Sequence, residues 1–140
     1  LTRDDFSWMG FNGRTVNNWN PWICSNWLTA ALILETDETR RTAAVNKIVR
    51  CLDHFLNGYE DDGGCDEGPS YWGRAGASLF DCLDLLHDAS AGALNAFSQP
   101  LVREIGLYIC RELVGLMAGS IWAETRAGGG STFVVELPAG

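Results

Sequence analysis

Basic residues are scarce in this chain, and their scarcity limits the partners that it can bind. Ten Lys and Arg stand against 18 Asp and Glu, which gives a formal net charge of −8 over 140 residues. A protein that binds a nucleic-acid backbone needs a stripe of basic side chains, and an anionic membrane surface attracts the same kind of stripe. We therefore expect no nucleic-acid partner and no charge-driven membrane contact.

Long apolar runs are also missing. The apolar runs are only a few residues long, whereas a membrane-spanning helix needs roughly 20 apolar residues. The first residues, Leu1 to Asp5, end on two carboxylates, and no long apolar run follows them. We therefore expect no signal peptide in this chain. With 46% hydrophobic residues, the chain can still bury the core of one domain.

Cysteines occur without the close pairing that metal or redox sites require. The five cysteines are widely spaced and form no C-x-x-C motif, which excludes a zinc knuckle and a redox dithiol. Cys65 lies in a Gly/Asp loop, where we expect an exposed thiol, and the other four lie in apolar helical stretches, where we expect burial. Cys51 and His54 are three residues apart but lack a third ligand, so they predict packing and no metal. Free thiols favour a reducing compartment such as the cytoplasm, but the localisation stays open.

Helical periodicity covers most of the chain. Apolar spacings of three and four predict helices over residues 22–35, 37–57, 73–87 and 100–117. Residues 120–125 and 132–137 have the pattern of strands, and the Gly-rich stretch 126–131 supplies the turn of a β-hairpin. The predicted fold is mainly α, with antiparallel helical hairpins followed by a C-terminal β-hairpin. Because an isolated hairpin is marginally stable, it must pack on the helices, pair with another chain or join a larger sheet.

Two segments that each precede a helix carry amides, aromatic rings and carboxylates. The first is Asn17-Asn18-Trp19-Asn20, and the second is Asp-Glu-Gly-Pro-Ser-Tyr-Trp-Gly-Arg at residues 66–74. If they meet, the rings can stack on a sugar while Asn, Asp and Arg hold its hydroxyl or carboxylate groups. The alternative is a structural loop whose Trp rings fill the core. The carboxylates of residues 61–67 also leave open a glycoside hydrolase pair, while their spacing does not match a calcium loop of the EF-hand type.

The stretch NNWNPWICSNW at residues 17–27, followed by DGGCDEGPSYWG at 62–73, resembles the heparinase II/III-like polysaccharide lyases. The resemblance covers residues 1–104 and implies part of an incomplete α/α toroid with its substrate cleft across the loop ends. It implies β-elimination at a uronic acid of an acidic polysaccharide, without a cofactor. By position, it implies that Asn18 neutralises the substrate carboxylate and that Tyr71 donates the proton. The implied substrate-binding residues are Trp19, Glu67, Trp72 and Arg74. Trp19 stands where the family often has His.

Residues 105–114 (IGLYICRELV), 117–124 (MAGSIWAE) and 128–138 (GGGSTFVVELP) resemble the C-terminal end of a histidine-kinase ATP-binding domain. The resemblance implies the helix after the last glycine box and the final two strands. The family's Asn-bearing helix, Asp-bearing glycine box and lid are not recognisable before residue 105, so we expect no nucleotide site. The boundary between residues 1–104 and 105–140 falls within one predicted helix, which indicates a fusion.

Together the two resemblances predict a polysaccharide lyase fragment that is weak or inactive alone. A non-catalytic carbohydrate-binding or structural fusion module is the alternative, and a kinase-derived ATPase module is a third. The C-terminal hairpin could also join two copies of the chain as a homodimer.

Overall fold

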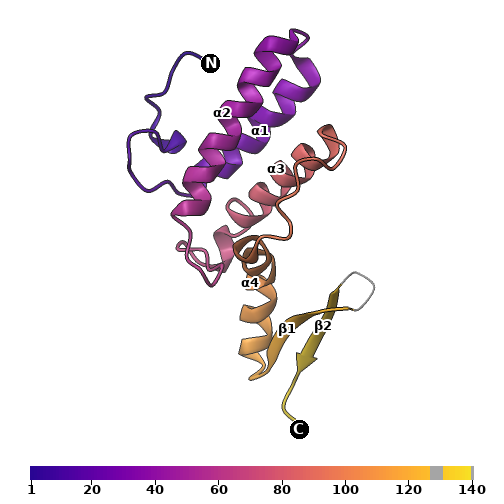
Figure 1. Ribbon diagram of the computed structural model, residues 1–140. Helices are drawn as coiled ribbons and strands as arrows, with labels where there is room; N and C mark the ends of the chain where they lie inside the picture. Colours follow the sequence, from indigo (N-terminus) through magenta and orange to yellow (C-terminus); the bar gives the residue numbers. More distant parts are fainter. Residues whose placement is uncertain (127–130, 140) are drawn as a thin grey trace.

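The computed structural model describes residues 1–126 and 131–139. Helices α1 (Trp19–Leu34) and α2 (Glu38–Asn57) form an antiparallel hairpin, and α3 (Gly76–Ala89) and α4 (Pro100–Leu116) follow. Strands β1 (Ser120–Thr125) and β2 (Ser131–Glu136) pair antiparallel. Two 3-10 turns, η1 (Ser7–Met9) and η2 (Pro69–Tyr71), precede α1 and α3. The predicted mainly helical fold with a C-terminal β-hairpin is confirmed (Figure 1).

The helix boundaries differ from the predicted ones at two N-terminal ends. Helix α1 begins at Trp19, with Asn18 in its N-cap position, and Pro21 lies in the first turn, where proline's missing N–H needs no partner. Helix α3 begins at Gly76, because the preceding residues form η2 and the turn after it. The predicted turn over residues 126–131 includes 127–130, which lie outside the described residues.

The core lies where α1 packs against both α2 and α3. Fully buried apolar side chains come from each of these helices and from α4, namely Cys24, Leu28, Ile48, Cys51, Leu79, Cys82 and Ile105. Asn20 is fully buried among them, and its Nδ2 donates to the carbonyl oxygens of Trp8 at 2.8 Å and Cys51 at 2.9 Å. This amide joins the N-terminal segment, α1 and α2.

Helix α4 is held against the loop between α2 and α3. The indole Nε1 of Trp72 donates to the carbonyl oxygen of Ile105 at 2.9 Å, and the guanidinium of Arg111 pairs with Glu104 and donates to the carbonyl oxygen of Asp62. Gly63, at φ +75°, lies against α4 so closely that an added Cβ would meet the backbone nitrogen of Ile105 at 2.4 Å. The loop and the helix are therefore joined by backbone contact.

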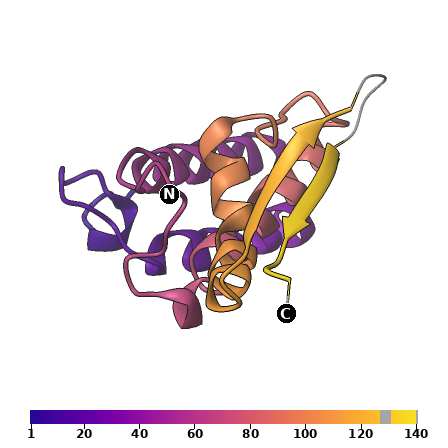
Figure 2. The same ribbon diagram turned by 90° about the horizontal axis from the view of Figure 1, so that it is seen from below.

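The β-hairpin packs on α4, which is the first of the three arrangements expected for it. Strand β1 contacts the helix, and from below the two strands are seen alongside α4 (Figure 2). The register pairs Ala123 with Phe133 and Ile121 with Val135, which places these four side chains on one face of the ribbon. Phe133 and Val135 remain 63% and 50% exposed, so the helix covers that face only in part.

The predicted burial is wrong at two cysteines. Cys65 is buried because its loop folds against Tyr59, and Cys110 is exposed because it borders an open cleft between α4 and the hairpin. Two leucines at helix positions are also exposed: Leu113 on α4 is 57% exposed, and Leu34 at the end of α1 is 74% exposed. Among the described residues, no helix is long and apolar enough to cross a bilayer.

Two alanines adopt the left-handed backbone region that glycine prefers. Ala91 follows the end of α3 with φ 51°, and Ala118 follows the end of α4 with φ 54°. Each lies where a helix chain turns away at its C-terminus, a position that commonly holds glycine.

Candidate functional site

The two segments that the sequence singled out lie side by side. Asn18 and Asp66 line one pocket of about 130 Å³ between residues 15–18 and the loop after α2. A second contact is made by Arg74, whose guanidinium carbon lies 4.0 Å from the ring centroid of Trp22. We call this region, formed by residues 15–22 and 58–74, the loop junction.

Asn18 lines this pocket and does not cap the helix that follows it. Its side chain is only 5% exposed, and it makes no capping hydrogen bond to the first turn of α1. The terminal atoms of Asn18 therefore retain their hydrogen-bonding capacity beside the pocket that they line.

Tyr59 is a residue of this pocket that the sequence analysis missed. Its hydroxyl is buried and has no hydrogen-bond partner among the described residues. Burial, with the neighbouring Cys65 thiol, raises the pKa of Tyr59, so the phenol keeps its proton at neutral pH and can donate a hydrogen bond. A tyrosine directly after Asn57-Gly58 at a helix end was the only signal in the sequence, and nothing in its spacing marked a site.

The charged residues of the pocket lining are both acidic. Glu60 and Asp66 contribute two carboxylates, and no Lys or Arg belongs to the lining. A second negative charge is disfavoured beside carboxylates, so a neutral hydroxyl group suits this pocket better than a sugar carboxylate does.

Aromatic rings gather outside the pocket. The rings of Trp19 and Trp22 lie edge to face with centroids 6.1 Å apart, and Trp19 is 56% exposed. Arg74 is exposed and stacks on Trp22. This group offers an apolar face and a positive charge together.

Three further candidate residues are not part of the pocket that Asn18 lines. Tyr71 is 50% exposed at the end of η2. Tyr71 and Glu67 do not line the pocket that contains Asn18. Trp72 is half-buried, and its indole N–H is already bonded to α4. Substrate roles for these three residues stay predictions.

No metal centre is formed in the part of the chain that the structure describes. No group of three or more His, Cys, Asp or Glu side chains converges there in a way that could hold a metal ion. His54 instead packs its ring edge to face with Phe11, at a centroid distance of 5.3 Å.

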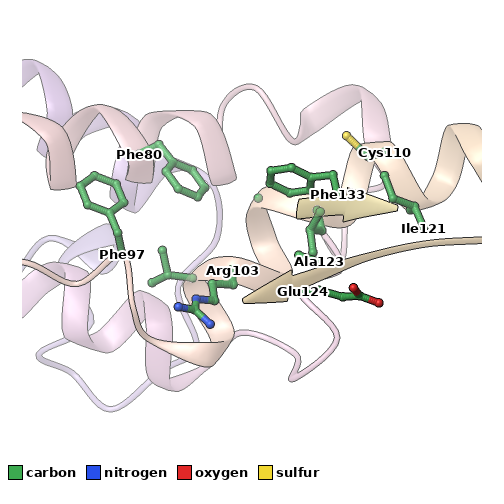
Figure 3. A pocket seen from close by; sticks show the side chains of 11 residues that line it. Phe80, Phe97, Arg103, Cys110, Ile121, Ala123, Glu124 and Phe133 are labelled. Carbon is green, nitrogen blue, oxygen red and sulfur yellow. The ribbon is translucent and has the colours of Figure 1, made fainter. Parts of the chain in front are cut away.

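A second and larger cavity lies between the helices and the hairpin, beside the contact of β1 with α4. This cleft of about 640 Å³ is lined by side chains of α3, α4, both strands and the connection after α3, including Phe80, Phe97, Arg103, Cys110, Glu124 and Phe133 (Figure 3). We call it the hairpin cleft. None of its lining residues belongs to the loop junction.

Comparison with known proteins bears on the C-terminal part of the chain. Residues 88–140 match the family described as histidine kinase-, DNA gyrase B-, and HSP90-like ATPase. The predicted similarity of the C-terminal segment to histidine-kinase ATPase domains is thereby confirmed, and the matched segment begins ahead of residue 105, at the end of α3. No curated protein matches the chain. The resemblance of residues 1–104 to heparinase II/III-like lyases stays a prediction.

Proposed function

We propose that this protein is a lyase-like fragment that binds uronic-acid-containing glycans at the loop junction and turns them over weakly or not at all. The observation that carries the proposal is the contact of Arg74 with Trp22, which joins the two segments and sets a cation beside exposed aromatic rings. A glycan would lay one ring on Trp19, direct its carboxylate to Arg74 and extend a hydroxyl toward Asn18 and Tyr59.

Binding is favoured over elimination for a chemical reason. In β-elimination, a base removes the proton α to the carboxylate, a double bond forms, and the departing glycosidic oxygen takes a proton from an acid. The carboxylate must be neutralised first, because the carbanion adds charge to an existing anion. Glu60 and Asp66 next to Asn18 oppose that neutralisation, and Tyr71 lies outside the pocket of Asn18. The site is thus better suited to holding a glycan than to breaking it.

The test is a titration with a uronate oligosaccharide that has no unsaturated end group. Heteronuclear NMR monitors binding, and the ultraviolet absorbance of the same mixture monitors elimination. We expect amide shifts at residues 15–22 and 58–74 and little or no absorbance growth.

Arg74→Gln should weaken binding about tenfold, which is typical of a lost charge-assisted hydrogen bond. Arg126 is an exposed arginine directly after β1, so Arg126→Gln is the matched control and should leave the affinity unchanged. Equal affinity of wild type and Arg74→Gln would overturn the proposed site. Steady absorbance growth that Tyr71→Phe abolishes would show turnover instead.

The family match of residues 88–140 favours a second candidate, a nucleotide-binding ATPase module. The same NMR experiment with Mg²⁺ and a non-hydrolysable ATP analogue distinguishes the two. Shifts confined to α4 and the hairpin would favour the ATPase candidate, whereas we expect no shift.

A further inference from the structure

The hairpin cleft has the size and lining of a small-molecule site. Its volume of about 640 Å³ falls within the roughly 300–1,000 Å³ that ligand pockets occupy. Three phenyl rings reach it from separate elements, Phe80 from α3, Phe97 from the following connection and Phe133 from β2 (Figure 3). The rings of Phe80 and Phe97 are stacked at a centroid distance of 6.2 Å.

The cleft leaves aromatic surface uncovered. Phe133 is 63% exposed although it lies on the hairpin face that turns toward α4. An aromatic ring placed between Phe133 and the stacked pair would remove apolar surface from water and extend the offset stacking that aromatic pairs prefer. Gly106 lines the cleft without a side chain, and a Cβ at that position would lie 3.1 Å from the Phe80 ring.

The cleft contains a positive charge that has no ion-pair partner among the described residues. Arg103 lines it and makes no ion pair with any carboxylate in the described residues. The only carboxylate of the lining, Glu124, accepts a hydrogen bond from the indole Nε1 of Trp122 at 2.8 Å. The cleft therefore presents a guanidinium that an anionic ligand group can pair with, at the edge of an aromatic surface.

We propose that the hairpin cleft binds an aromatic monocarboxylate, with its ring among Phe80, Phe97 and Phe133 and its carboxylate on Arg103. A planar carboxylate matches the fork of the guanidinium, which can donate two parallel hydrogen bonds. Charge complementarity selects a single anion, because a polyanion would meet Glu124. The proposal is independent of glycan binding, since the two sites share no residue.

The test compares 2-naphthoate with its neutral isostere 2-naphthamide in NMR titrations of the intact chain. We expect 2-naphthoate to bind at least tenfold more tightly than the amide, with shifts at Gly106, Ala123 and Phe133. Arg103→Gln should remove this preference and leave the affinity for 2-naphthamide unchanged, whereas Arg126→Gln should keep it. Ala123→Trp, which fills the cleft from β1, should abolish binding of both probes.

Cys110 supplies an independent readout. It is the only exposed cysteine of the five, and it lines the cleft. Its alkylation by iodoacetamide should slow at least fivefold when 2-naphthoate is saturating. Thermal unfolding of each variant confirms that it is folded. Equal affinity for acid and amide, unchanged binding by Ala123→Trp, or shifts outside the cleft would each overturn the proposal.

Discussion

Asn18 and Asn20 are two residues apart and have opposite roles. Asn20 is fully buried, and its amide nitrogen donates hydrogen bonds to two carbonyl oxygens of other segments. Asn18 makes no capping bond and faces the small pocket of the loop junction. The sequence presents both as amides ahead of a helix, so it could identify the segment as polar and unusual. It could not tell which amide is structural, because that depends on Trp8 and on Cys51, which is 31 residues away.

Replacing Asn20 by Asp should destabilise the fold strongly. The variant exchanges a buried donor for an oxygen that faces the carbonyl oxygens of Trp8 and Cys51, at distances of 2.8 and 2.9 Å from the present nitrogen. We expect a loss of roughly 3 kcal/mol in the free energy of unfolding, measured by urea denaturation. Asn26→Asp is the control, since Asn26 also donates to a carbonyl but is exposed, and it should lose less than about 1 kcal/mol. Similar losses in both variants would contradict the structural role of Asn20.

At the scale of elements, the loop between α2 and α3 helps to hold α4 against the other helices. Its Gly-rich composition predicted a loop but gave no sign of what it would touch. In the structure, Gly63 approaches the backbone of α4, and Trp72 and Arg111 reach across the same contact. Glycine is needed at residue 63 both for its φ of +75° and for the absent side chain.

Gly63→Ala should therefore cost more than replacement of a glycine that has the same φ but open space around it. Its Cβ would lie 2.2 Å from the carbonyl carbon of Glu104, which forces backbone to move, so we expect a loss of about 3 kcal/mol or more in unfolding free energy. Gly13→Ala is the matched control, because Gly13 has the same φ of +75° and nothing within 4 Å of an added Cβ, and strain alone should cost about 1–2 kcal/mol. Guanidinium denaturation followed by circular dichroism gives both values. Equal losses would show that the approach of the loop to α4 contributes little.

For the whole molecule, burial is uneven along the chain. Every member of the core cluster lies between Met9 and Ile105, while the hairpin contributes none. Periodicity predicted the helices well because each has apolar residues at regular spacing. It could not predict which faces would be covered, and so Leu113 and Cys110, regular in pattern, are exposed. Coverage depends on neighbours that are distant in sequence, and the hairpin covers α4 only in part.

Hydrogen exchange should separate the molecule into two stability levels. We expect the amides of Leu28, Ile48 and Leu79 to exchange only through global unfolding, since their side chains are fully buried. Amides of β1 and β2 should exchange at least tenfold faster, because a two-stranded ribbon with an exposed apolar face opens locally. Native-state exchange measured by NMR checks this expectation. Equal protection of helices and hairpin would mean that the chain unfolds as one cooperative unit.

Ala91 and Ala118, the two alanines with left-handed backbone conformation, show where the stability of this fold can be raised. A non-glycine residue in that conformation carries roughly 1 kcal/mol of steric energy. The chain thus retains avoidable strain after both α3 and α4, at positions remote from the loop junction. A designer who wished to raise the melting temperature would start at these two sites, since glycine there relieves a local clash and leaves every buried contact intact.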